Sequence, residues 1–197
     1  MVEQSEIGLT WTVEEPIARS SHALVFDHRV WLVDPTDEPS ALEQALRLGE
    51  PAGVIQLVDR HNRDCARLAA DLGVPHLRVP DEVPGTKLTV VRLIGMPFWR
   101  EVALWWPATG TLVVAEAVGT SLIYAPAQGG AGIHPLLRLW PPRPLDYFAP
   151  QNLLVGHGPA VRGGAATDAL QRALRRCRRD LPRAAAALVK AGMAQRS

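Results

Sequence analysis

The segment that most constrains the fold is a short apolar stretch that runs straight into a polar cluster. Gly53–Val58 is apolar except for Gln56, a pattern typical of a strand buried on both faces. The polar run Asp59-Arg60-His61-Asn62-Arg63-Asp64 follows, and apolar residues at helical spacing then continue to Leu72, with Gly73 as the stop. Polar residues between a buried strand and a helix often form a functional site in α/β sheets. They could equally cap the helix and form surface ion pairs, and this pattern alone favours neither interpretation.

The rest of the chain predicts a mixed α/β protein with helices outside a sheet or a pair of sheets. Ser40 and Glu43 have the spacing of a capping box at the start of the first helix, and Gly119–Pro150 reads as one long loop. The predicted strands are Ile7–Val13, His22–Phe26, Val30–Val33, Gly53–Val58, Thr86–Leu93, Glu101–Trp106, Thr111–Ala115 and Asn152–Val155. The predicted helices are Ala41–Leu48, Asn62–Leu72 and Thr167–Gly192, the last broken near Pro182.

Length and charge exclude several classes of protein. The 197 residues suit one domain, so we expect a single domain over 1–197. The formal charge of +1 argues against a protein that works by wrapping nucleic acid, although a run of arginines from Arg172 to Arg183 offers a basic helix face as a third possibility. No apolar run is long enough to span a bilayer, and the acidic first residues lack a signal-peptide pattern, so no membrane contact and a cytoplasmic location are expected.

Two further positions could carry chemistry. In Gly156-His157-Gly158-Pro159 the flanking glycines leave the imidazole unshielded, so it could reach a metal or a substrate, although a solvent-exposed turn histidine is the commoner case. Glu116 follows four apolar residues at the end of a predicted strand, where a partly buried carboxylate needs an arginine or a metal as its partner. His134 in the long loop could add to such a site, but we expect it to be exposed to solvent.

The order and spacing of these segments resemble the metallo-β-lactamase-fold hydrolase superfamily over nearly the whole chain. Leu32-Val33-Asp34-Pro35 is similar to its early strand ending in aspartate, and Val54–Val58 leads into the position of its His-x-His-x-Asp-His motif. Thr111–Glu116 is similar to the strand that supplies a bridging acid, and Gly156-His157-Gly158-Pro159 is similar to the final metal-ligand turn. The resemblance implies a four-layer αββα sandwich, with one or two metal ions at one edge.

The metal-binding motif departs from the family pattern at most positions. His61 keeps a motif histidine, whereas Asp59, Arg63 and Asp64 stand in place of a histidine, the aspartate and the last histidine. Met96 stands at the next ligand position, Glu116 replaces the bridging aspartate, and His157 is retained.

The altered set leaves the metal content open. Asp59, His61, Glu116 and His157 could hold one divalent ion such as zinc, manganese or iron. Arg63 would repel a dication, so we hypothesise a metal-poor or metal-free site in which the Arg63 cation replaces a metal and pairs with Glu116 or Asp64.

The resemblance therefore implies a hydrolase-like protein with an atypical site and an unidentified ester-type or phosphodiester substrate. Without a metal, His61 or His157 could act as a general base, and we place Asp64 with them as a catalytic candidate. The alternative is a non-catalytic module that keeps the fold and binds a small molecule or a protein. A small-molecule ligand is the expected partner, nucleic acid is not, and the oligomeric state is not encoded in these patterns.

Overall fold

Two β-sheets form the centre of the molecule. The computed structural model describes residues 1–13, 17–124 and 130–181. The first sheet has the order β1-β2-β3-β4-β5-β6, and the second has the order β13-β12-β9-β8-β7. The strands of the first sheet are β1 (Val2–Ser5), β2 (Gly8–Val13), β3 (Arg19–Phe26), β4 (Arg29–Val33), β5 (Glu50–Gln56) and β6 (His76–Arg78). Those of the second are β7 (Thr89–Met96), β8 (Trp99–Trp106), β9 (Thr111–Val114), β12 (Asn152–Val155) and β13 (Val161–Arg162).

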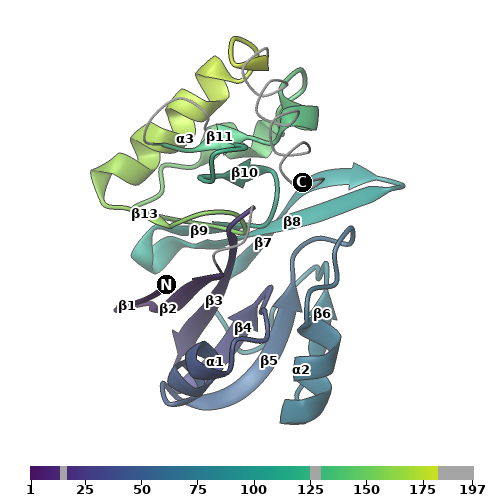
Figure 1. The fold of residues 1–197 in the computed structure, drawn as a ribbon, viewed down its shortest axis with the longest axis vertical. Coiled ribbons are helices and arrows are strands. Elements are labelled where there is room, and N and C mark those ends of the chain that lie inside the picture. The colour runs from purple at the N-terminus through teal and green to yellow at the C-terminus, as the bar shows by residue number, and fades with distance from the viewer. Residues whose placement is uncertain (14–16, 125–129, 182–197) are drawn as a thin grey trace, which may run out of the picture.

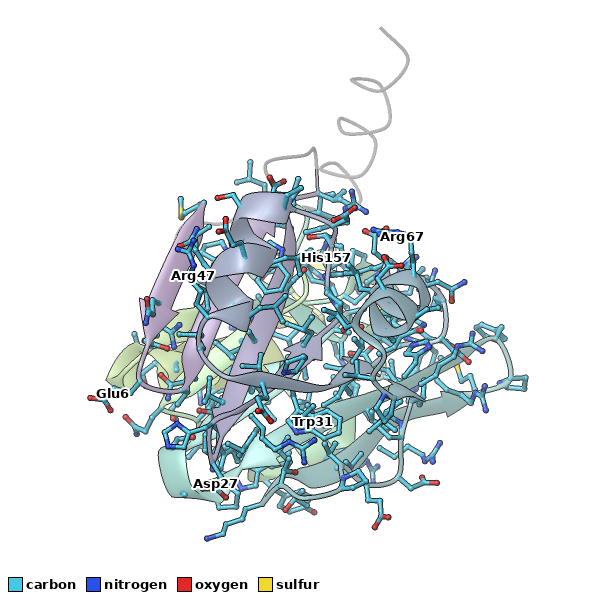
Figure 2. The ribbon with its side chains drawn as sticks, turned by 90° about the horizontal axis from the view of Figure 1, so that it is seen from below. Glu6, Asp27, Trp31, Arg47, Arg67 and His157 are labelled. Carbon is cyan, nitrogen blue, oxygen red and sulfur yellow. The ribbon has the colours of Figure 1, made fainter. Side chains whose placement is uncertain are left out.

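Helices cover the outer face of each sheet and complete four layers. The helices α1 (Pro39–Leu46) and α2 (Cys65–Leu72) lie on the first sheet, and α3 (Gly164–Arg176) lies on the second (Figures 1 and 2). The small ladder of β10 (Val118–Gly119) with β11 (Gly132–Ile133) lies under α3. The predicted four-layer αββα sandwich is therefore confirmed.

The first sheet is buried on both faces because its strands alternate between two apolar clusters. On β4, Trp31 and Val33 join the core between the sheets, while Val30 and Leu32 pack toward α1 and α2. This alternation follows from the two-residue period of a strand. It explains why these segments are almost continuously apolar, and why the helices supply small residues such as Ala41 to the outer cluster.

Element boundaries differ from the predictions at several places. The predicted capping box is wrong: α1 begins at Pro39 with Glu38 as its N-cap, which makes no side-chain capping bond, because proline suits the first helical position. The helix α2 begins at Cys65 rather than Asn62 and ends at Gly73, which adopts the left-handed conformation as predicted.

At the C-terminal end, α3 begins at Gly164, three residues before its predicted start. It ends at Arg176, and the predicted break near Pro182 lies outside the described residues. The predicted loop over 119–150 contains β11 and two short 3-10 helices, Pro135–Leu137 and Arg143–Tyr147. No helix within the described ranges is long and apolar enough to cross a membrane.

The two sheets are joined by backbone hydrogen bonds along the edge where parallel strands end. In the first sheet β4 and β5 are parallel, and in the second β9 and β12 are parallel, so the carboxyl ends of each pair share an edge. Ser20 N–H donates to Gly156 O at 2.9 Å, and Val102 N–H donates to Leu57 O at 3.0 Å, which ties β3 to the turn after β12 and β8 to the end of β5. These bonds position the loops after β5, β9 and β12 side by side.

Candidate functional site

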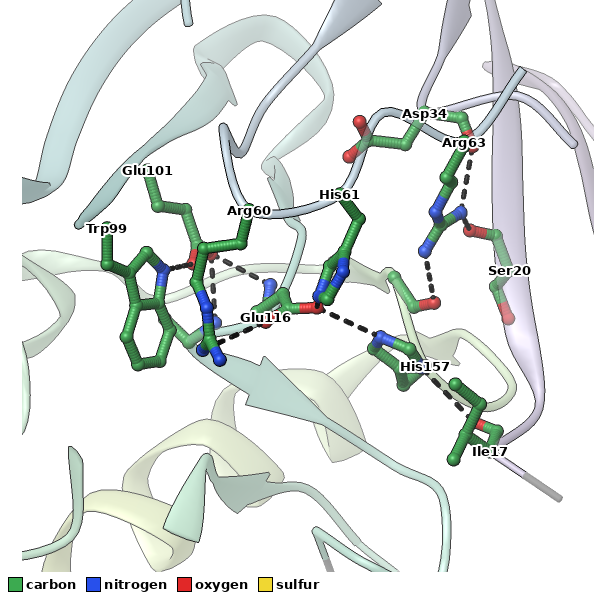
Figure 3. Close-up of polar contacts among 12 residues, drawn as sticks. Ile17, Ser20, Asp34, Arg60, His61, Arg63, Trp99, Glu101, Glu116 and His157 are labelled. Atoms are coloured by element: carbon green, nitrogen blue, oxygen red, sulfur yellow. Dashed lines mark hydrogen bonds and ion pairs between the residues drawn. The ribbon is translucent and has the colours of Figure 1, made fainter. Parts of the chain in front are cut away.

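The loop after β5 delivers two side chains toward the space between the sheets. Asp59 N–H donates to Arg100 O at 3.1 Å and Asp64 N–H donates to Pro35 O at 3.2 Å, so both ends of the loop are held. Between these anchors, His61 and Arg60 point toward Glu116 (Figure 3). The His61 side chain is 51% exposed, and that of Arg60 is 31% exposed.

The segment after β9 places Glu116 beside Arg60 and His61, and a second carboxylate, that of Glu101, binds the backbone of this segment. Glu101 on β8 is fully buried, and its Oε1 accepts the backbone N–H groups of Glu116 and Ala117, each at 2.9 Å. Its Oε2 accepts the indole N–H of Trp99 at 3.2 Å. Burial raises the pKa of Glu101 to about 7 in spite of these donors. In the sequence, Glu101 is marked only as the first residue of a predicted strand.

The turn after β12 places His157, and its glycines are required by close backbone approach. A Cβ on Gly156 would lie 2.3 Å from Ala115 O, so any larger residue would push the turn away from β9. Gly158 has a φ of +96°, in the region that favours glycine, and its N–H donates to Ala18 O at 2.7 Å. The His157 ring is buried in this turn, so it is neither the unshielded ring nor the solvent-exposed turn histidine considered from the sequence.

Glu116 connects the three cationic or proton-carrying groups. Its Oε1 lies 2.5 Å from His61 Nε2 and 3.4 Å from His157 Nε2, and its Oε2 lies 3.6 Å from Arg60 Nη1 (Figure 3). Burial alone would raise the pKa of the Glu116 carboxyl, but the hydrogen bonds from His157 and His61 outweigh it and hold that pKa well below its usual range. Glu116 is thus ionised at neutral pH, with its partners arranged around it.

The two histidines differ in what their second ring nitrogen does. The Nδ1 of His157 contacts Ile17 O at 3.1 Å, so both of its ring nitrogens face oxygen acceptors. In His61, Nε2 faces Glu116, and Nδ1 makes none of the hydrogen bonds found among the described residues. Of these two histidines, His61 is therefore the one with a nitrogen available to a ligand.

A pocket of about 340 Å³ opens beside these residues. Its polar wall consists of Arg60, His61, Glu116 and His157, and Tyr124 stacks on His157 with the ring centroids 5.5 Å apart. The remaining lining residues are Ile17, Ile123, His134, Pro135 and Leu136. A cavity of this size that is mostly apolar with a few convergent polar groups is typical of a small-molecule site.

His134 forms part of this wall, so the expectation that it is exposed to solvent is wrong. Its ring makes an edge contact with Trp99 at 4.8 Å, and its Nδ1 accepts the N–H of Leu136 at 3.2 Å. Burial lowers the pKa of His134 to about 4. It is consequently a neutral, structural ring at neutral pH.

Three residues singled out in the sequence lie outside the pocket. Asp59 accepts hydrogen bonds from Arg100 N and Arg100 Nε, both at 2.8 Å. Asp64 accepts the Asp37 N–H at 2.8 Å and faces Arg67 on α2, and Met96 sits at the end of β7 in the β7–β8 hairpin. Each has a structural partner or packing role where the resemblance implied a ligand or a catalytic group.

Arg63 also has other partners than those hypothesised. It pairs with neither Glu116 nor Asp64. Its guanidinium donates instead to the backbone oxygens of Ser20, Asp34 and Gly156 (Figure 3). The residue has a φ of +43°, which turns its side chain toward β3, and the guanidinium that approaches Glu116 belongs to Arg60. Arg60 was not predicted as a site residue, since nothing in the run 59–64 distinguishes its two arginines.

The residues present do not fit the metal centre that the resemblance implies. Within the described parts of the chain, no group of three or more histidine, cysteine, aspartate or glutamate side chains is arranged to hold an ion. Asp59 is bonded to Arg100 away from the pocket, and the Arg60 guanidinium lies 3.6 Å from the carboxylate expected to bridge metals. The Arg60 cation lies beside this carboxylate, and it would repel a dication bound to the same group.

Comparison with solved structures shows the fold. The metallo-β-lactamase from Pontibacter korlensis matches with a TM-score of 0.61 and 13% identity, covering 90% of this chain and 99% of that one. The DIM-1 metallo-β-lactamase exposed to ceftazidime gives 0.60 and 14%, covering 90% and 95%, and the metallo-β-lactamase from Erythrobacter litoralis gives 0.55 and 12%, covering 90% and 91%. No protein-family model matches the sequence, and the search of curated proteins finds no relative. The chain has the metallo-β-lactamase fold.

Proposed function

We propose that this chain is a hydrolase-like enzyme whose site works without a metal ion, with His61 as general base for water and a small ester-type molecule as substrate. The observation that carries the proposal is the contact of His61 Nε2 with the Glu116 carboxylate in the wall of the 340 Å³ pocket. A carboxylate that accepts one imidazole N–H sets the tautomer in which the other nitrogen is an acceptor. That nitrogen, Nδ1, can then take a proton from water.

The reaction follows from this tautomer. The water oxygen attacks the substrate carbonyl carbon as its proton moves to His61 Nδ1, and the carbonyl electron pair moves onto the oxygen. When the tetrahedral intermediate collapses, the bond to the leaving group breaks, and the leaving oxygen or sulfur takes the proton back from His61. Glu116 stays ionised throughout and stabilises the imidazolium that forms between the two steps.

His157 serves as a support rather than as a second base in this proposal. Both of its ring nitrogens face oxygen acceptors, and its ring stacks under Tyr124. It fixes the position of Glu116, which in turn orients His61. Asp64 has no part in the reaction because it lies outside the pocket, facing Arg67 on α2.

The test is hydrolysis of a panel of esters, thioesters, lactones and phosphodiesters by the purified protein, with EDTA or with added Zn²⁺, Mn²⁺ or Fe²⁺. We expect turnover of an ester-type compound that EDTA leaves unchanged. His61→Gln should lower kcat about 10²–10⁴-fold, the range of a general base. His28→Asn is the matched control, since His28 is an exposed turn histidine with positive φ, and it should keep full activity.

Two results would overturn the proposal. Turnover that appears only with added metal and disappears with EDTA would assign the chemistry to an ion. Binding of small molecules in the pocket without turnover of any compound would favour the alternative of a non-catalytic binding module.

A further inference from the structure

Arg60 occupies a position that the general-base proposal leaves unused. Its guanidinium carbon lies 4.4 Å from the centroid of the Trp99 ring, and Nη1 lies 3.6 Å from Glu116 Oε2. The side chain also lines the pocket. Among the described residues that line this pocket, Arg60 is the one with a fixed positive charge.

The orientation of Arg60 is set by buried groups. Trp99 is 1% exposed, and its indole N–H donates to the fully buried Glu101. The same Glu101 carboxylate accepts the backbone N–H groups of Glu116 and Ala117. One buried carboxylate therefore fixes both the ring that stacks with Arg60 and the backbone that carries Glu116.

The stacking on Trp99 leaves N–H donors of Arg60 available to a ligand. A guanidinium has five N–H donors in one plane, and stacking on an aromatic face uses none of them. The described partner of these donors is Glu116, at 3.6 Å, which is beyond an ordinary hydrogen bond. Because the donors point along the edges of the plane, one guanidinium can face two oxyanions at once.

The rest of the pocket lining determines which kind of molecule can carry the oxyanion. Ile17, Ile123, Pro135 and Leu136 supply the apolar wall of the pocket, together with Tyr124. Such a wall favours a ligand body that loses little by leaving water. A ligand with a second charged group would have no partner on this wall.

We propose that Arg60 is the oxyanion-binding residue of this pocket, and that the pocket takes ligands that join one carboxylate-type oxygen group to an uncharged apolar body. The role of Arg60 in turnover rests on the proposed function, because there the oxyanion is the carbonyl oxygen of the intermediate. The role of Arg60 in binding a carboxylate is independent of the proposed function. Glu101 and Trp99 act as positioning residues for Arg60.

The experiment compares two ligands of nearly equal shape, 4-phenylbutyrate and 4-phenylbutyramide, by isothermal titration calorimetry. The carboxylate should bind wild-type protein at least about tenfold more tightly, the value of one charge-assisted hydrogen bond. Arg60→Met should reduce this ratio to about one while leaving the affinity for the amide unchanged. Arg60→Lys, which keeps the charge but loses the planar stack, should give an intermediate ratio. Arg47→Met, on the exposed end of α1, is the control and should leave the ratio unchanged.

The outcomes separate this inference from the proposed function. His61→Gln should lower kcat about 10²–10⁴-fold and keep the preference for the carboxylate, whereas Arg60→Met should lose that preference. Equal affinity for the two compounds, a preference that survives in Arg60→Met, or no binding of either compound at millimolar concentration would each overturn the assignment of Arg60. None of these results would by itself change the role of His61, which the hydrolysis panel tests.

Discussion

Replacing Arg63 tests whether this side chain stabilises the fold or compensates for a missing metal. Its guanidinium bridges three separate segments, donating to Ser20 O on β3, to Asp34 O after β4 at 2.8 Å, and to Gly156 O after β12 at 2.8 Å. Arg63→Met keeps most of the aliphatic stem and removes every donor. The three carbonyl oxygens then lose their charged partner at the edge where the two sheets meet.

The expected loss of stability follows from these contacts. A hydrogen bond from a charged donor contributes about 1.5–3 kcal/mol when buried, and three such bonds would total at most about 9 kcal/mol. The side chain is only partly buried, so water can replace some of the bonds, and we expect a loss of about 4 kcal/mol. Since domains of this kind unfold with about 5–15 kcal/mol, the variant should fold but only marginally.

Urea unfolding monitored by tryptophan fluorescence and circular dichroism measures this loss. With a urea dependence of about 2 kcal/mol per molar, the midpoint should fall by about 2 M. Arg47→Met is the control, because its ion pair with Glu43 is exposed and should contribute less than about 1 kcal/mol. Arg63→Lys should recover only part of the loss, since an ammonium cannot match three carbonyls from a planar fork.

A midpoint within about 0.5 M of wild type in Arg63→Met, with chelator-resistant metal now bound, would refute this reasoning. Arg63 would then act as the charge replacement inferred from the sequence, and its contacts with backbone oxygens would be incidental.

Three further perturbations test other parts of the structure. Burial lowers the pKa of His22 to about 3, so this ring is neutral in the folded protein but takes a proton near pH 6.5 in the unfolded chain. Its contribution to stability is therefore complete above pH 6.5 and declines toward pH 3. In urea titrations, wild type should lose about 2 kcal/mol more stability than His22→Gln between pH 7 and pH 5. An equal loss in both proteins would contradict the buried, neutral state of His22. Glu101→Gln should destabilise the fold by about 2 kcal/mol, because the new side-chain NH₂ must face a donor, either the Trp99 indole N–H or the two backbone N–H groups. In a double-mutant cycle, Glu101→Gln and Trp99→Phe should show a favourable coupling energy of about 1 kcal/mol. Simple additivity of the two changes would count against these hydrogen bonds. Gly156→Ala should lower the free energy of unfolding by about 1–3 kcal/mol, because its Cβ would lie 2.3 Å from Ala115 O. Gly164→Ala, which has open space at the start of α3, should leave that free energy unchanged. Equal thermal midpoints for the two variants would refute the close approach at Gly156.

Local periodicity in the sequence determined a mixed α/β class with helices outside a sheet or a pair of sheets, and the family resemblance implied the four layers. Continuous apolar runs marked strands buried on both faces, and glycines at Gly73, Gly156 and Gly158 marked turns that only small residues allow. The family resemblance, rather than these patterns, implied that Glu116 and His157 lie near His61. The structure brings them together because they follow strands whose carboxyl ends share one edge of the sandwich.

The identity of the arginine in the pocket was decided only by the tertiary structure. Arg60 and Arg63 stand three residues apart in an irregular loop, where no period relates a side chain to a face. Their directions are set by the bonds that hold the loop ends to Arg100 and Pro35, and by the positive φ of Arg63. These contacts join residues distant in the chain. As a result Arg63 donates to backbone oxygens of both sheets, and Arg60 lies beside Glu116. Glu101 also reaches the site through contacts between distant residues: its carboxylate accepts the Glu116 N–H after β9, and its backbone pairs with Val58 after β5.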